Sequence, residues 1–115
     1  MKYVITESKL TNIIDEFISS QFDGLKHTDD SFNNTIRDIW VDHNGKPVII
    51  ILNIDSEQYR EIFILENVYA TIYYMFSMNS KYDIQIPLIM WFKKHMGLEI
   101  DGIQTFDNDG FDEIY

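Results

Sequence analysis

The feature that most constrains this chain is a run of five apolar residues that closely follows a turn sequence. Val48–Leu52 contains no polar residue, and Asn44-Gly45 lies just before it. Successive side chains of a strand point to opposite faces, so an uninterrupted apolar run is typical of a strand covered on both sides. Asn-Gly between β-rich segments is typical of a tight hairpin. We therefore expect strands over 36–41 and 46–54 that pair around this turn, with Ile50 in the most buried run.

The N-terminal segment has the spacing of an amphipathic helix over 6–20. Its apolar residues recur at intervals of three and four along one face: Leu10, Ile13, Ile14, Phe17 and Ile18. Thr6 is suited to the N-cap, and Ile5 to a hydrophobic staple on this helix. The polar segment 23–34 is predicted to be a loop. Segment 59–65 is predicted to be a third strand, with a helix from Ser56 onward as the alternative.

Two more helices are expected in the second half of the chain. Asn67 is suited to cap a helix that ends near Met78, with an inward stripe of Val68, Ile72, Met75 and Phe76. Pro87 is suited to the first turn of a further helix, and Gly97 to its C-cap. From 98 to 115 the chain carries six acidic residues and no basic one, which indicates an acidic tail.

These elements predict a single α+β domain over 1–115, in the order α-β-β-β-α-α. Its sheet is a three-stranded antiparallel meander with the helices packed on it. Because both faces of 46–54 need cover, we expect the helices to divide between the faces. Helix 6–20 would cover one face and the other two helices the second, or a partner chain would cover one of them.

Charge excludes several classes of function. The chain has 9 basic and 19 acidic residues, a net charge of −10, and only two arginines, Arg37 and Arg60. A nucleic-acid binder needs clustered Lys and Arg, so direct nucleic-acid binding and docking on an anionic membrane are not expected. There is no cysteine, no apolar run long enough for a membrane span and no signal peptide, which predicts a soluble protein that is not secreted.

The sequence carries no recognisable catalytic or metal-binding motif. His27, His43 and His95 lack the spacing of a zinc site. Asp107-Asn108-Asp109-Gly110 resembles part of a calcium loop, but Thr105 stands at the first ligand position and the twelfth falls beyond Tyr115. We therefore predict no enzyme activity, no cofactor and no metal. A small hydrolase built from carboxylates that folding brings together remains an alternative.

Two sets of residues are candidates for a binding surface. The aromatic set could lie in the core or in a protein interface, where Tyr and Trp are enriched: Trp40, Tyr69, Tyr73, Tyr74 and Trp91. The acidic set is expected to gather on one face if the protein mimics a nucleic-acid backbone: Asp23, Asp29, Asp30, Asp107, Asp109, Asp112 and Glu113.

Two blocks of the sequence resemble small uncharacterised proteins of tailed bacteriophages with low-GC genomes. The opening block, Met1 to Leu10, has their "ITES-x-L" pattern, and the block from Ile86 to Leu98 has a W-F-x-x-x-x-G/N-L pattern near the end. Ile5-Thr6-Glu7 is also similar to the signal cut by phage prohead proteases, although the staple and the N-cap explain the same residues. The resemblance implies a location in the cytoplasm of the infected host cell or in the virion.

Two functions follow as hypotheses. The first is a phage-encoded, non-enzymatic protein–protein interaction module, either a minor virion component or an accessory factor that acts on a host protein. The alternative is an acidic inhibitor that presents its carboxylates to a basic host protein as a nucleic-acid mimic. Both imply a protein partner, and a homo-oligomer is compatible with the first.

Overall fold

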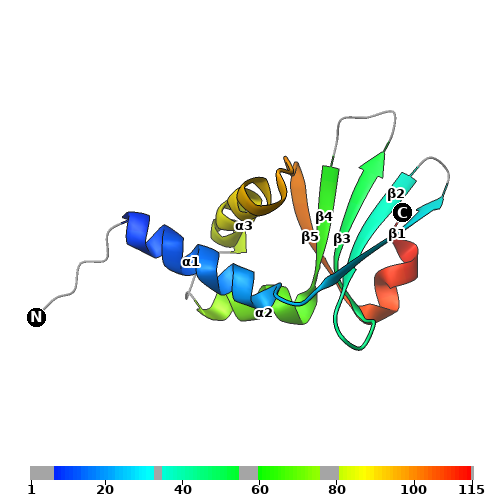
Figure 1. Cartoon of the computed structure of the whole chain (residues 1–115), viewed down its shortest axis with the longest axis horizontal. Helices are drawn as coiled ribbons and strands as arrows, with labels where there is room; N and C mark the ends of the chain where they lie inside the picture. The colour runs from blue at the N-terminus through cyan, green and yellow to red at the C-terminus, as the bar shows by residue number, and fades with distance from the viewer. Residues whose placement is uncertain (1–6, 33–34, 55–59, 76–80, 115) are drawn as a thin grey trace, which may run out of the picture.

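The structure, a computed structural model, describes residues 7–32, 35–54, 60–75 and 81–114. Among them a five-stranded mixed sheet carries three α-helices, so the predicted α+β class is confirmed (Figure 1). The strands lie in the order β1-β2-β3-β4-β5, with β1 to β4 antiparallel and β5 parallel to β4. Their bounds are Lys26–Phe32, Thr35–Val41, Pro47–Ile54, Arg60–Leu65 and Gly102–Phe106. The helices are α1 (Glu7–Gln21), α2 (Glu66–Met75), α3 (Lys81–Met96) and a short 3-10 helix, η1 (Asn108–Glu113).

The predicted hairpin is formed by β2 and β3. Asp42 Oδ1 accepts the backbone N–H groups of Asn44 and Lys46, at 2.9 and 3.0 Å, and Gly45 has a φ of 79°. A positive φ of this size strains residues with a Cβ, so glycine is suited to this position.

The third predicted strand is also confirmed over Arg60–Leu65, where it excludes the helical alternative, while residues 55–59 lie outside the described residues.

The apolar run on β3 is buried along its whole length, as predicted. Ile49, Ile50 and Ile51 are at most 1% exposed. Ile49 and Ile51 belong to one core cluster with residues of the three α-helices, whereas Ile50 belongs to a second cluster on the opposite face. Both faces of the strand are therefore covered.

The predicted division of the helices between the two faces is wrong. All three α-helices contribute to the first cluster, through residues such as Ile18, Ile72 and Phe92. The second face is covered by the C-terminal segment instead: Ile114 is buried there and Phe111 packs beside it. This follows from topology, because η1 comes directly after β5 and turns back over the sheet face opposite the helices (Figure 1).

Segment 98–115, predicted as an acidic tail, contains β5 and η1, so the three-stranded meander and the order α-β-β-β-α-α are wrong in detail. Ile103 and Phe106 are both less than 10% exposed, and they anchor β5 in the two opposite clusters. Parallel strands need a long crossover, which α2 and α3 supply between β4 and β5. The two buried apolar residues of β5 are three positions apart, so the strand shows no apolar alternation with a period of two in the sequence.

The predicted loop over 23–34 is also wrong, because Lys26–Phe32 is strand β1. All seven of its residues are exposed, on both faces. An edge strand with no buried face shows no apolar alternation, so only its backbone pairing with β2 defines it.

The helices differ from their predicted boundaries. α1 agrees within a residue, and Ile14 and Ile18 are buried as expected, but Ile13 is 46% exposed. The N-cap and staple lie in residues 1–6, outside the described residues, as does the predicted end of α2 beyond Met75. Met75, which was predicted to point inward, is 61% exposed.

α3 begins at Lys81, so Pro87 lies inside the helix rather than in its first turn. Ile84, which is fully buried, starts the apolar stripe one turn before the proline, and Leu88 continues it. Burial of this stripe offsets the hydrogen bond that Pro87 cannot donate. Gly97, with a φ of 66°, ends the helix as predicted. No helix in the described part of the chain is long and apolar enough to cross a membrane.

Candidate functional site

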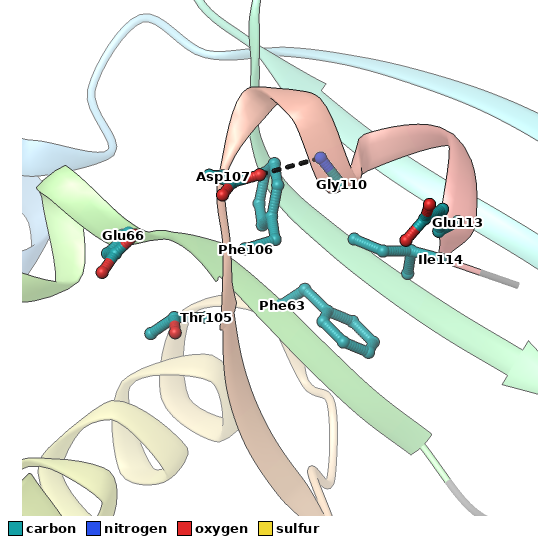
Figure 2. Close-up of a pocket in the computed structure, with 8 residues that line it drawn as sticks. All are labelled: Phe63, Glu66, Thr105, Phe106, Asp107, Gly110, Glu113 and Ile114. Atoms are coloured by element: carbon teal, nitrogen blue, oxygen red, sulfur yellow. Dashed lines mark hydrogen bonds between the residues drawn. The ribbon is translucent and has the colours of Figure 1, made fainter.

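Two open hollows lie along β5, and both are lined by Glu66 and Thr105. The first, of about 430 Å³, lies between α2 and η1 and is lined by Phe63, Glu66, Thr105, Phe106, Asp107, Gly110, Glu113 and Ile114 (Figure 2). The second, of about 370 Å³, lies against α2 and is lined by Glu66, Tyr69, Ala70, Tyr73, Tyr74 and Thr105. The two hollows share the lining residues Glu66 and Thr105, and we refer to them together as the α2–η1 groove.

The parallel pairing of β4 and β5 positions this groove. Leu65, the last residue of β4, lies opposite Phe106, the last residue of β5. The carboxyl ends of both strands therefore lie at the same end of the sheet. α2 starts directly after β4 and η1 starts shortly after β5, so the first turn of each helix borders the groove.

The floor of the first hollow is part of the protein core. Phe106 and Ile114 are buried in the second cluster, and Phe63 packs against it. Figure 2 shows these three side chains between Glu66 on one side and Glu113 on the other. A ligand there would contact an apolar floor between acidic walls.

The walls of the groove carry negative charge. Glu66, Asp107 and Glu113 are all exposed, and neither hollow has a basic residue in its described lining. Asp107 caps η1, since its Oδ1 accepts the backbone N–H of Gly110 at 2.8 Å. An added Cβ at Gly110 would lie 3.3 Å from the same oxygen, so a larger residue would crowd this cap.

Tyrosines form the second hollow. Tyr69 and Tyr73 are half-buried against the core, whereas Tyr74 is 74% exposed. The rings of Tyr73 and Tyr74 meet edge to face, with their centroids 5.1 Å apart. Partial burial raises the pKa of the Tyr69 hydroxyl above its ordinary value of 10.0, and a hydrogen bond with Gln85 opposes this effect.

The structure brings part of each predicted set together at this groove. Tyr69, Tyr73 and Tyr74 from the aromatic set line it, with Asp107 and Glu113 from the acidic set. Glu66 and Thr105, which join the two hollows, were missed by the sequence analysis. Glu66 stands out in the sequence only as an acid next to a predicted helix, and the position of Thr105 depends on a strand that the pattern did not show.

The two tryptophans lie elsewhere. Trp91 is 6% exposed in the first core cluster, and its Nε1 donates to Ser19 Oγ at 2.8 Å. This burial excludes it from an exposed interface. Trp40 is half-buried, with its ring 4.8 Å from that of His27.

The remaining acids do not gather on one face. Asp29 and Asp30 follow each other on β1, so their side chains point to opposite faces. Asp30 is bound by Arg37, with Asp30 Oδ1 2.8 Å from Arg37 Nε. Asp23 and Asp109 are exposed beyond α1 and on η1, and the side chain of Asp112 lies outside the described residues. The expectation of a single acidic face is therefore not met.

A row of hydrogen-bonded polar side chains crosses the face of the sheet on which the α-helices lie. Asp38 accepts from Asn53 Nδ2 at 2.7 Å and lies 2.9 Å from His27 Nε2. Asn53 Oδ1 in turn accepts from Arg60 Nε at 2.9 Å. These four residues come from four adjacent strands, and their bonds link those strands.

The histidines belong to separate surroundings. His95 Nε2 lies 2.9 Å from Asp15 Oδ1, which joins α3 to α1, while His27 lies on β1. Within residues 7–32, 35–54, 60–75 and 81–114, no group of three His, Cys, Asp or Glu side chains is arranged to hold a metal ion.

The composition of the groove favours binding of a cation. Carboxylates attract ammonium and guanidinium groups, and tyrosine rings attract the same groups through their faces. The described linings contain no histidine, serine or lysine, residues that nucleophilic hydrolases commonly use.

Comparisons of this chain with protein-family models, with curated proteins and with solved structures give no match.

Proposed function

We propose that this protein is a non-enzymatic protein–protein interaction module that binds a basic, extended segment of a partner in the α2–η1 groove. The observation that carries the proposal is the composition of this groove: three tyrosines and three carboxylates around an apolar floor, without a basic residue in the described lining. Tyrosine is among the residues most enriched in protein interfaces, and Tyr74 is largely exposed here.

Charge supports a basic partner. The whole chain carries −10, so a cationic segment would be attracted over a distance before it reached the groove. Within the groove, Glu66 and Glu113 would pair with Lys or Arg side chains, and Tyr73 and Tyr74 would stack on their alkyl or guanidinium portions.

The sheet edge supports an extended partner. β5 ends the strand order, and Gln104 and Thr105 on it are exposed. An edge strand presents unpaired backbone groups that a further strand can bind, with alternate side chains entering adjacent pockets. Thr105 lies on β5 and lines both hollows, so a segment bound beside it would reach both.

The resemblance to small proteins of tailed bacteriophages extends this proposal. It suggests that the partner is a virion protein or a host protein bound during infection. The alternative of a nucleic-acid mimic has less support, because Asp29 and Asp30, two of the acids expected to share a face, point to opposite faces of β1.

A selection from a random library of extended peptides tests the proposal. We expect the full chain to enrich peptides rich in Lys and Arg, and the enrichment to disappear in Tyr74→Ala and in Glu66→Lys. Matched controls are Met90→Ala, which removes an exposed apolar side chain on α3, and Glu16→Lys, which makes the same charge change on α1. Both controls should retain the enrichment.

Two results would contradict the proposal. One is a selection without enrichment of basic peptides. The other is an enrichment that the groove variants leave unchanged, since binding would then take place on another surface.

A further inference from the structure

Strand β1 presents an open edge with an unusual charge order. It ends the sheet opposite β5, and all seven of its residues are exposed. Its sequence begins Lys26-His27-Thr28-Asp29-Asp30, with basic residues on one side of the threonine and acidic residues on the other. A strand of this kind is complementary to itself when it is paired antiparallel.

The register of such a pair follows from the strand geometry. If a two-fold axis passes between the Thr28 residues of two copies, Lys26 of each copy lies opposite Asp30 of the other, and His27 opposite Asp29. Opposed residues of an antiparallel pair share a face, so the four pairs can form with side chains as close as those within the sheet.

We propose that β1 is the interface between two copies of this chain, paired antiparallel about Thr28 into one continuous sheet. The surface is self-complementary, as a two-fold interface requires. The inference goes beyond the proposed function and does not rest on it, because β1 and β5, the strand along which the two hollows lie, are at opposite edges of the sheet. Both grooves of the dimer stay open.

Other registers are less favourable. A shift by two residues in one direction places Asp29 opposite Asp29 of the second copy, and a parallel arrangement places Lys26 opposite Lys26. Like charges directly opposite each other are destabilising. In the Thr28-centred register, each of the two basic residues of one strand lies opposite an acidic residue of the other strand.

The contacts within one copy are compatible with this pairing. Asp30 keeps its bond to Arg37 and its side chain is still 41% exposed. The side chain of His27 is 48% exposed beside Asp38. The strand pair is small and the net charge of each chain is −10, so we expect a weak dimer whose population rises with concentration.

Cysteine cross-linking of the full chain tests the register, because the natural sequence has no cysteine. In Thr28→Cys the two sulfur atoms would face each other across the axis, within reach of a disulfide. In the matched variant Ser31→Cys, residue 31 of one copy would lie six positions along the strand from residue 31 of the other. The two sulfur atoms would then be too far apart for a disulfide. We expect Thr28→Cys to form disulfide-linked dimers about tenfold faster than Ser31→Cys under mild oxidation.

Sedimentation equilibrium tests the charge pairs over about a hundredfold range of concentration. The average mass of the natural chain should rise from 13.7 kDa towards twice that value. Lys26→Glu should weaken association about tenfold or more, whereas Lys93→Glu, with the same change in charge on α3, should leave it unchanged.

A chain that stays monomeric throughout overturns the inference. So does equal cross-linking of the two cysteine variants, or a dimer that Lys26→Glu does not weaken, since the copies would then meet elsewhere. None of these results bears on peptide binding in the groove.

Discussion

Arg37 Nη1 donates a hydrogen bond to the backbone carbonyl of Phe111 at 2.9 Å, although the two residues are 74 positions apart. The same guanidinium group lies 4.3 Å from the centre of the Phe111 ring. Nε and Nη2 bind the carboxylate of Asp30, and the arginine is only 4% exposed. One buried cation therefore joins β1, β2 and η1, and it holds the segment that covers the second face of the sheet.

This arrangement predicts a large effect of replacing Arg37. Arg37→Met removes the hydrogen bonds from the guanidinium group to Asp30 and to the Phe111 carbonyl, so we expect the free energy of unfolding to fall by about 2–4 kcal/mol. Arg37→Lys keeps the charge but loses the bidentate geometry. Its free energy of unfolding should therefore lie between those of the natural chain and of Arg37→Met. Urea denaturation followed by tryptophan fluorescence measures both. Lys93→Met, on the exposed end of α3, is the control, and an equal effect there would contradict the assignment.

Ile50 should be among the most sensitive positions in the chain. It is fully buried in the second cluster, so Ile50→Asp would bury an unpaired charge and lower the unfolding free energy by about 4 kcal/mol or more. Ile50→Val removes a single methylene and should cost about 1 kcal/mol. Equal stability of the two variants in urea denaturation would show that this position is open to solvent.

Removal of residues 108–115 should uncover the second face without unfolding the first. Phe111 and Ile114 pack on the cluster that contains Ile39 and Ile50, so their loss exposes apolar surface. We expect increased binding of a hydrophobic dye and a lower urea midpoint, while circular dichroism keeps the α-helical signal. A truncated chain with unchanged dye binding and midpoint would contradict this role of the C-terminal segment.

The raised pKa of Tyr69 predicts a loss of stability at high pH. In the unfolded chain this hydroxyl ionises near its ordinary value of 10.0, whereas in the folded protein it stays neutral to a higher pH. The contribution of this hydroxyl to the free energy of unfolding is therefore fully present below pH 10. It decreases as the pH rises from there through the folded-state pKa. Tyr69→Phe should remove this part of the pH dependence, as measured by urea midpoints in that range. An unchanged profile would mean that partial burial does not affect the hydroxyl.

The central hairpin and α1 were predictable because local signals agree with the tertiary structure there. Gly45 supplies the positive φ of the turn, and the run around Ile50 has to be buried on both sides wherever the strand lies. In α1 the helical spacing of Ile14 and Ile18 leads directly to the buried stripe. Each of these features depends on residues that are close in sequence.

The candidate groove could be predicted only in part. The grouping of Tyr69, Tyr73 and Tyr74 is visible in the sequence because they lie on one helix. Their meeting with Thr105 depends on the parallel pairing of β4 with β5, which are separated by two helices. Trp91, on α3, was an equally good aromatic candidate, and only its packing against α1 shows that it belongs to the core.

The sequence by itself determined the α+β class, the hairpin, the burial of 48–52 and the acidic, aromatic-rich character of the chain. The tertiary structure decided that β1 is a strand, that β5 pairs in parallel, and that η1 covers the second face through Arg37. The reason is physical: an exposed edge strand has no apolar periodicity, since backbone hydrogen bonds to a neighbouring strand define it. Contacts between distant segments, such as Arg37 with Phe111, depend on which faces remain uncovered once the nearer elements have packed.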